Sequence, residues 1–295
     1  MRTVTIRQTG RRRRSENSNV NCSEAGLIVQ VQQDFPIIDG QGHSAGDFPA
    51  DILISKMRES GAVILRNVAC DRYGFIALTQ RIAPGVERGV APNSNGLEFH
   101  GEAYYTPWPP DVLWFYCVQP PEIDGQTLLC DGVKLARLLS PNARAFFRRN
   151  GLVYEMAFEQ SEWASYFKTE NRDEIMNQIE GFPSIRARFA GDTLHTRYTT
   201  YAIRQTKWGN APAFINSLLH ALDSTQRTDI GDYGLRTEIP PAILSELQGL
   251  TTKFTYSLEW KHRDIVMIDN TRVMHARRPF RGRREIIAVN GEARF

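Results

Sequence analysis

The sequence predicts a mainly β fold with flanking helices, arranged as a double-stranded β-helix, also called a jelly roll or cupin-like barrel. Many short apolar runs bounded by turn residues follow one another along the chain, as expected for strands. Patterns with helical spacing occur early, in the middle and late. A His-x-Glu pair and a downstream histidine lie more than half the chain apart. Such side chains meet only if non-adjacent strands come together, as in a double-sheet jelly roll.

The individual elements follow from local patterns. We expect strands at 26–32, 61–66, around His100, and at 111–118, 126–130, 151–158, 184–190, 193–204, 264–269 and 284–290. We expect helices at 47–60, 71–82, 132–139, 141–150, within 160–182, at 213–222 and at 240–250. Asp71 is the predicted N-cap of one helix, and Ser140 followed by Pro141 opens another. The run 111–118 is apolar throughout, so it is predicted to be buried on both faces.

The 295 residues predict one domain over 26–295, preceded by a disordered basic arm at 1–25 that contains Arg11–Arg14. A segment at about 160–211 is predicted to be a lid over the barrel mouth. No apolar run is long enough to span a membrane, and no signal peptide is evident. Four scattered cysteines indicate a reducing, cytoplasmic location. A net charge of +3 does not support nucleic-acid binding, and the sequence leaves homo-oligomer formation open.

The candidate metal site consists of His100, Glu102 and His275. His100 and Glu102 are two residues apart, so on an extended strand their side chains would point to the same side. His275 follows the apolar run 264–270. Two histidines and one carboxylate on one face of a metal leave three coordination positions open, as in non-haem Fe(II) oxygenases. A surface histidine beside a solvated glutamate is the ordinary alternative for His-x-Glu alone, because that spacing arises often by chance.

Five motifs in this order and spacing resemble the taurine dioxygenase-like (TauD/TfdA, clavaminate synthase-like) branch of the Fe(II)/2-oxoglutarate-dependent oxygenases. The resemblance covers roughly residues 50–295. The motifs are Phe99-His100-x-Glu102, Pro109-Pro110-Asp111, Asp124-Gly125-Gln126-Thr127, Asp269-Asn270 with His275, and Gly282-Arg283-Arg284. The resemblance implies oxidation of a small molecule coupled to decarboxylation of 2-oxoglutarate, with Fe(II), 2-oxoglutarate and O2 as cofactor and cosubstrates. Hydroxylation is the default outcome, and desaturation or cyclisation are the variants.

The same resemblance implies residues for 2-oxoglutarate. Arg284 would bind its distal carboxylate through two parallel hydrogen bonds, which a planar guanidinium can form. Arg283 is the competitor, because alternation along a strand lets only one of the pair face inward. Thr127 matches the threonine that hydrogen-bonds the same carboxylate; an ordinary β-branched strand residue is its alternative role.

Two departures from the taurine enzymes narrow the function. The carboxylate ligand is Glu102 where those enzymes have Asp, as in the clavaminate synthase-like and amino-acid-hydroxylating relatives. Its presence argues against halogenation, because the related halogenases have a small residue there. Ala288 occupies the position of the arginine that binds the sulfonate, so a small sulfonate is not the expected substrate. An amino acid or natural-product intermediate is the expected substrate class.

The substrate-facing candidates are Asn95, Tyr104, Arg188 and Tyr198, for which turn formation, core packing or plain surface charge are the competing roles. Two other functions fit the residues. A zinc hydrolase could use the same three ligands, although the sequence has no HExxH helix and would give Arg284 and Thr127 no task. A non-catalytic jelly-roll binding protein could have kept the fold alone.

Overall fold

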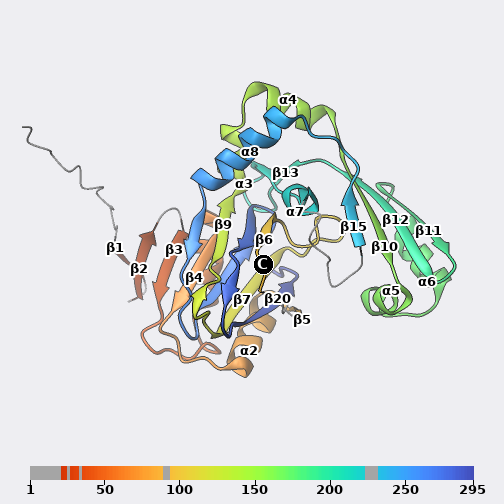
Figure 1. Ribbon diagram of the computed structural model, residues 1–295. Helices are drawn as coiled ribbons and strands as arrows, with labels where there is room; N and C mark the ends of the chain where they lie inside the picture. Colours follow the sequence, from red (N-terminus) through yellow and green to blue (C-terminus); the bar gives the residue numbers. More distant parts are fainter. Residues whose placement is uncertain (1–20, 25–26, 33–34, 89–93, 223–231) are drawn as a thin grey trace, which may run out of the picture.

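Two β-sheets packed face to face form the centre of the molecule (Figure 1). The computed structural model describes residues 21–24, 27–32, 35–88, 94–222 and 232–295. Side chains from both sheets share one buried core, to which Phe115 and Val266 contribute from the first sheet and Leu129 and Leu258 from the second. The predicted jelly roll with flanking helices is therefore confirmed.

The first sheet has eight strands in the order β1-β2-β3-β4-β17-β7-β20-β5. Its strands are β1 (Asn21–Glu24), β2 (Leu27–Gln32), β3 (Phe35–Asp39), β4 (Ala62–Arg66), β17 (Ile265–Asp269), β7 (Val112–Gln119), β20 (Glu285–Gly291) and β5 (Gly85–Arg88). The facing sheet has four strands, β16 (Tyr256–Leu258), β9 (Thr127–Asp131), β18 (Val273–Arg277) and β6 (Leu97–His100), in that order. β7 is buried over its first six residues, as its apolar sequence predicts.

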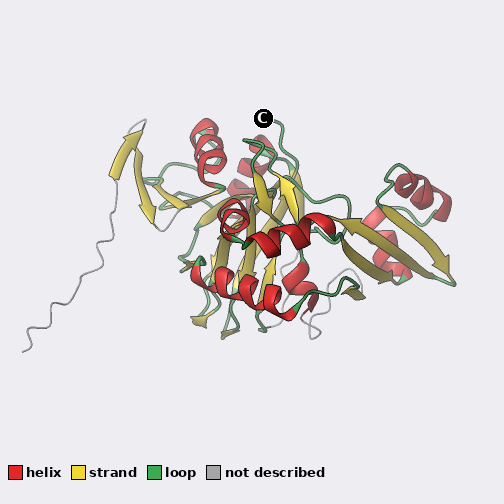
Figure 2. Ribbon diagram, turned by 90° about the horizontal axis from the view of Figure 1, so that it is seen from above, coloured by secondary structure: helices red, strands yellow, loops and turns green. Residues whose placement is uncertain are grey.

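A third sheet projects to one side of this barrel (Figures 1 and 2). Its order is β11 (Ile185–Ala190), β12 (Thr193–Thr200), β10 (Leu152–Phe158) and β15 (Asp232–Leu235). Helices α5 (Gln160–Phe167) and α6 (Arg172–Glu180) contact it. Much of the segment predicted to be a lid therefore belongs to this lateral sheet and its helices. Two short strand pairs complete the β-structure, β13 (Ile203–Gln205) with β14 (Pro212–Phe214), and β19 (Phe280–Arg281) with β8 (Ile123–Asp124).

Helices cover the outer faces of the sheets. α1 (Ala50–Ser60) and α2 (Arg72–Ile82) share a buried cluster with the outer face of the eight-stranded sheet. The predicted N-cap of α2 is confirmed, because the Asp71 carboxylate accepts a hydrogen bond from the Gly74 amide at 2.8 Å. The remaining helices are α3 (Gly132–Leu138), α4 (Pro141–Arg149), α7 (Leu218–Leu222) and α8 (Pro241–Lys253). Within the described ranges no helix is long and apolar enough to cross a membrane.

The structure corrects several expectations. The predicted helix 213–222 is wrong, because its first two residues belong to strand β14, residues 215–217 are irregular, and only α7 is helical. The side chain of Asn216 between them accepts from the Leu218 amide and donates to the Ala202 carbonyl, which starts the helix late. Strand β5 lies in a stretch predicted to be a loop. β1 lies within the arm predicted to be disordered, whose first twenty residues fall outside the described part of the chain.

Candidate metal and cosubstrate site

Two histidines face each other across neighbouring strands. His100 is the last residue of β6 and stands opposite His275 of β18 in an antiparallel ladder. Side chains directly opposite one another in such a ladder lie on the same face of the sheet. The two imidazole rings have centroids 4.2 Å apart, and both residues are buried, with exposed fractions of 8% and 7%. The expectation that His275 merely follows β17 is corrected, since it has a strand of its own, β18.

Glu102 reaches the same point from a turn. β6 ends at His100, so the alternation along one strand that we expected is not what brings the carboxylate there. Glu102 Oε2 lies 4.0 Å from His100 Nε2 and 3.8 Å from His275 Nε2. Ala103 adopts a positive φ of 60°, which reverses the chain directly after Glu102. A Cβ on Gly101 would lie 2.6 Å from the Tyr104 ring, so this turn requires glycine between the two groups.

Asn270 fixes the backbone of Glu102. Its side-chain Oδ1 accepts from the Glu102 amide at 2.9 Å, and its Nδ2 donates to the Glu102 carbonyl at 3.1 Å and to the Pro110 carbonyl at 2.8 Å. Asn270 is fully buried and lies between β17 and β18. One side chain therefore ties the turn that carries the carboxylate to the strands that carry His275.

Replacement of Asn270 by alanine is expected to lower the free energy of unfolding by about 2–4 kcal/mol, because it leaves buried backbone groups without partners. It should also weaken metal binding, since Glu102 loses its support. Urea denaturation and an anaerobic Fe(II) titration measure the two effects. Asn142→Ala on the exposed side of α4 is the matched control. Equal stability of the two variants would contradict the assigned role.

The three side chains suit a divalent cation. One ligand atom from each of His100, Glu102 and His275 lies within 4.8 Å of the other two. His100 Nδ1 lies 2.8 Å from the Glu98 carbonyl, a contact that places a proton on Nδ1 and leaves the Nε2 lone pair toward Glu102. Burial, with two neighbouring histidines adding to it, holds the pKa of His275 well below its usual value. Its imidazole is therefore neutral near pH 7, as a metal ligand must be.

A second polar group lies at the end of β9. Arg284 donates from Nε to the Gly125 carbonyl at 3.1 Å, and its Nη2 lies 3.4 Å from Thr127 Oγ1. Trp260 Nε1 donates to the same hydroxyl oxygen at 3.1 Å. An oxygen that accepts from two N–H groups keeps its own proton for a further acceptor. Burial, reinforced by Arg277, lowers the pKa of Arg284 to about 10, so the guanidinium stays charged near neutral pH. Arg283, by contrast, is exposed.

Three residues near these groups were not singled out from the sequence as site residues. Arg277 is 5% exposed, stands opposite Thr127 in the ladder, and donates to the Asn95 carbonyl at 2.7 Å. Arg277 lies two residues after His275, and this spacing on a strand indicates that the two side chains point to the same face. His220 of α7 stacks on His100 with centroids 4.8 Å apart. Asn290 Nδ2 lies 3.5 Å from Glu102 Oε1. Neither His220 nor Asn290 belongs to a motif with recognisable spacing.

The four substrate candidates are dispersed. The Asn95 carbonyl accepts from Arg277, and Tyr104 is buried with its ring beneath the Arg204 guanidinium at 5.1 Å. Tyr198 is buried in the core beside the lateral sheet. Arg188 is exposed on β11. Only Asn95 and Tyr104 therefore have described contacts with residues around the metal and cosubstrate groups.

Asp269, next to Asn270, is a buried carboxyl group whose Oδ1 accepts two hydrogen bonds from Thr271. Burial raises the pKa of Asp269 to about 6. A raised pKa in the folded state favours the protonated form, so this contribution to stability is present below about pH 4 and is lost as the pH rises through about 6. Asp269→Asn is therefore expected to raise the free energy of unfolding by about 1–2 kcal/mol at pH 8 and to change it little at pH 4. Urea denaturation at both values, with exposed Asp47→Asn as control, tests this; a gain independent of pH would contradict it.

Comparison with known proteins places this geometry in a family. Residues 46–289 match the model of the family described as "Taurine catabolism dioxygenase TauD, TfdA family", which covers most of the chain. The chain belongs to this family. Its TauD/TfdA membership confirms the resemblance read from the five motifs, and it shows that the protein is an oxygenase of this group.

Individual relatives of this TauD/TfdA protein are distant. The dapdiamide synthesis protein DdaC from Enterobacter agglomerans is 23% identical over 215 residues, which cover 66% of this chain and 65%, just under two thirds, of DdaC. The crystal structure of AAD-2 in complex with Mn(II) and N-oxalylglycine has a TM-score of 0.61 at 16% identity and covers 91% of this chain and 98% of its own. PvcB from Pseudomonas aeruginosa has a TM-score of 0.59 at 14% identity, with coverages of 93% and 94%. These structures support the fold.

Proposed function

We propose that this protein is an Fe(II)/2-oxoglutarate-dependent dioxygenase that oxidises a small molecule and releases succinate and CO2. The observation that carries the proposal is the convergence of His100, Glu102 and His275 at one buried point in a chain of the TauD/TfdA family. Two neutral imidazoles and one carboxylate leave one net positive charge on Fe(II), which suits chelation of a 2-oxo acid. The iron supplies O2 activation when bound.

The protein groups have separate tasks in this proposal. Arg284 binds the distal carboxylate of 2-oxoglutarate, and the Thr127 hydroxyl donates its remaining proton to the same carboxylate. Their contacts with Gly125 and Trp260 hold both groups in place before the cosubstrate arrives. Binding, orientation and exclusion of water are the work of the chain, while hydroxylation, desaturation or cyclisation depends on the substrate.

The proposed substrate is an amino acid or a natural-product intermediate. DdaC is named as a protein of dapdiamide synthesis, and one structure of PvcB is described as an "Fe, alpha-ketoglutarate dependent oxygenase from an isonitrile synthetic pathway". Ala288, in place of a sulfonate-binding arginine, supports a substrate other than taurine. Asn95 and Tyr104 are the positions to vary when a substrate is in hand, because Tyr198 and Arg188 lie on the lateral sheet.

The buried cysteines bear on the compartment in which the enzyme works. Cys70, Cys117 and Cys130 are buried free thiols, which suits a reducing compartment, and we therefore expect a cytoplasmic enzyme. We propose that residues 26–295 form one catalytic domain that binds neither membranes nor nucleic acids. The homo-oligomeric state is for solution measurements to determine.

Metal-dependent turnover tests the proposed function. Protein stripped of metal is loaded anaerobically with Fe(II) or Zn(II), and succinate is measured after addition of 2-oxoglutarate, O2 and a panel of amino acids and peptides. The expected result is succinate release with Fe(II) alone, stimulated by one class of compound. Hydrolysis with Zn(II) and no succinate would overturn the proposal in favour of a hydrolase. Absence of Fe(II) binding would overturn it in favour of a non-catalytic binding protein.

A further inference from the structure

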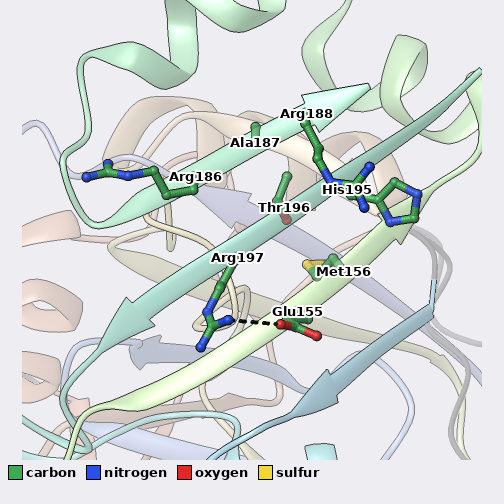
Figure 3. Close-up of a pocket in the computed structure, with 8 residues that line it drawn as sticks. All are labelled: Glu155, Met156, Arg186, Ala187, Arg188, His195, Thr196 and Arg197. Carbon is green, nitrogen blue, oxygen red and sulfur yellow. Dashed lines mark ion pairs between the residues drawn. The ribbon is translucent and has the colours of Figure 1, made fainter. Parts of the chain in front are cut away.

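The outer face of the lateral sheet is strongly basic (Figure 3). It contains a pocket of about 360 Å³. The residues that line the pocket are Glu155, Met156, Arg186, Ala187, Arg188, His195, Thr196 and Arg197. The pocket lining therefore includes three arginines and a histidine but only one carboxylate, that of Glu155. None of these residues belongs to the metal and cosubstrate groups, so the pocket is a separate feature of the fold.

Strand register places the basic side chains of this face in facing pairs. Arg186 stands directly opposite Arg197, and Arg188 stands opposite His195, across the antiparallel pair β11–β12. Like charges directly opposite one another destabilise a sheet. The intervening residues Ile185, Leu194 and Tyr198 are buried in the core on the other face. The sheet thus has one apolar face that stabilises it and one charged face on which Arg186 and Arg197 repel each other.

The single carboxylate of the pocket is already engaged. Glu155 Oε1 lies 3.5 Å from Arg197 Nη1, and its Oε2 accepts from Arg236 Nε at 2.6 Å. Arg186 contacts only the carbonyl oxygens of Pro183 and Ile185 among the described residues. Arg188 forms no hydrogen bond or ion pair within the described ranges. Two exposed guanidinium groups on an edge strand are therefore available to an external anion.

We infer that this face is a docking surface for a partner protein that presents an acidic helix. Arg186 and Arg188 lie two residues apart on one strand, so their Cα atoms are about 6.4–6.8 Å apart, and positions i and i+4 of a helix repeat at about 6 Å. The two backbone repeats match closely enough for each flexible arginine side chain to reach one carboxylate of the helix. This inference does not depend on the proposed function, because no residue of the metal site takes part.

Other anions fit the surface less well. Small-ligand sites bury most of their ligand, whereas the Arg197 side chain here is 61% exposed and the pocket lies on an open sheet face. Single-stranded nucleic acids stack their bases on aromatic side chains, and no Phe, Tyr or Trp lines this pocket. Because only two guanidinium groups are available here, we expect a weak, transient protein contact.

A binding experiment with a matched charge control tests the inference. The probe is a fluorescent helical peptide of about 20 residues with glutamates at i and i+4, and its affinity for the full chain is measured by fluorescence anisotropy at about 50 mM and 200 mM salt. Arg186→Ser/Arg188→Ser is expected to weaken binding at least about tenfold, since each arginine loses a charge-assisted hydrogen bond. Arg148→Ser/Arg149→Ser, which removes two exposed charges from α4, should change it less than about twofold.

Four outcomes would overturn the inference. The first two are undetectable binding of the peptide to the unaltered chain at the lower salt, and equal losses of peptide affinity in the two double variants. The third is binding of inorganic pyrophosphate that is as tight as that of the peptide and is lost in Arg186→Ser/Arg188→Ser. The fourth is displacement of the peptide by single-stranded DNA at a concentration lower than that of unlabelled peptide needed for the same effect. Thermal melting checks that both double variants are folded, which their exposed positions predict.

Discussion

Replacement of His275 by alanine is expected to lower Fe(II) affinity and 2-oxoglutarate turnover by at least about 100-fold. Loss of a partner that only orients a metal ligand already costs about 10–100-fold, and His275 is a proposed ligand itself. The change removes one of three candidate ligands that lie within 4.8 Å of one another. The two that remain are too few to hold the metal tightly. Anaerobic Fe(II) titration and succinate release measure the two quantities.

The His275 experiment requires a control for folding, because this side chain is buried in β18. His275→Gln keeps most of the volume and a polar tip, so it should fold while still losing most of the metal affinity. His262→Ala removes an exposed imidazole that contacts only the Val118 carbonyl among described residues, and it should bind Fe(II) normally. Wild-type Fe(II) affinity in folded His275→Ala would refute the proposed centre.

The barrel was predictable from sequence because burial leaves strong signals in strands. The apolar run 111–118 indicated a strand covered on both faces, and β7 is an interior strand that pairs with β17 on one side and β20 on the other. Helix α2 was predictable because Asp71 supplies a local cap whose effect does not depend on distant contacts. Short elements held by tertiary contacts were missed. β5 has only four residues and is defined by its pairing with β20.

The candidate site was found for a reason that turned out to be incomplete. Equal spacing along a strand suggested that His100 and Glu102 share a face, yet the strand ends at His100 and a turn carries the carboxylate. What brings the groups together is long-range. Asn270, far along the chain, holds the backbone of Glu102, and pairing of β6 with β18 aligns the two histidines. No local pattern encodes such contacts. The site could be predicted because the order and spacing of the five motifs resemble those of a known family.

His220 and Arg277 are site neighbours that the sequence does not reveal. His220 lies in a stretch whose apolar residues predicted one long helix, and nothing in that pattern marks it as a neighbour of His100. Arg277 stands in a cluster of arginines of which Arg278, Arg281 and Arg283 are exposed, and charge alone does not show that Arg277 is the most deeply buried. Burial of a single polar residue depends on what packs over it, and that information is spread over the whole fold.

Replacement of Arg284 by alanine is expected to raise the KM for 2-oxoglutarate well over tenfold. A buried charge-assisted pair contributes about 1.5–3 kcal/mol, and 1.4 kcal/mol corresponds to a factor of ten. The Arg284 side chain is partly buried, and it is charged near pH 7 despite its lowered pKa of about 10. Its contacts with Gly125 and Thr127 are to neutral oxygens, and none of its described hydrogen bonds is to a carboxylate, so a bound anion would balance the charge.

The neighbouring arginine provides the control for this experiment. Arg283→Ala removes the same charge one residue earlier, from an exposed side chain whose amide, not its guanidinium, contacts Glu122. Its KM for 2-oxoglutarate should stay within about twofold of the unaltered enzyme, while Fe(II) affinity should stay unchanged in both variants. Thr127→Val, which keeps the shape and removes the hydroxyl, should raise KM by a smaller factor, because a neutral hydrogen bond contributes about 0.5–1.5 kcal/mol. A KM for 2-oxoglutarate that rises in Arg283→Ala and not in Arg284→Ala would contradict the prediction. It would assign the cosubstrate carboxylate to Arg283 and leave the Arg284 guanidinium beside Thr127 without a role.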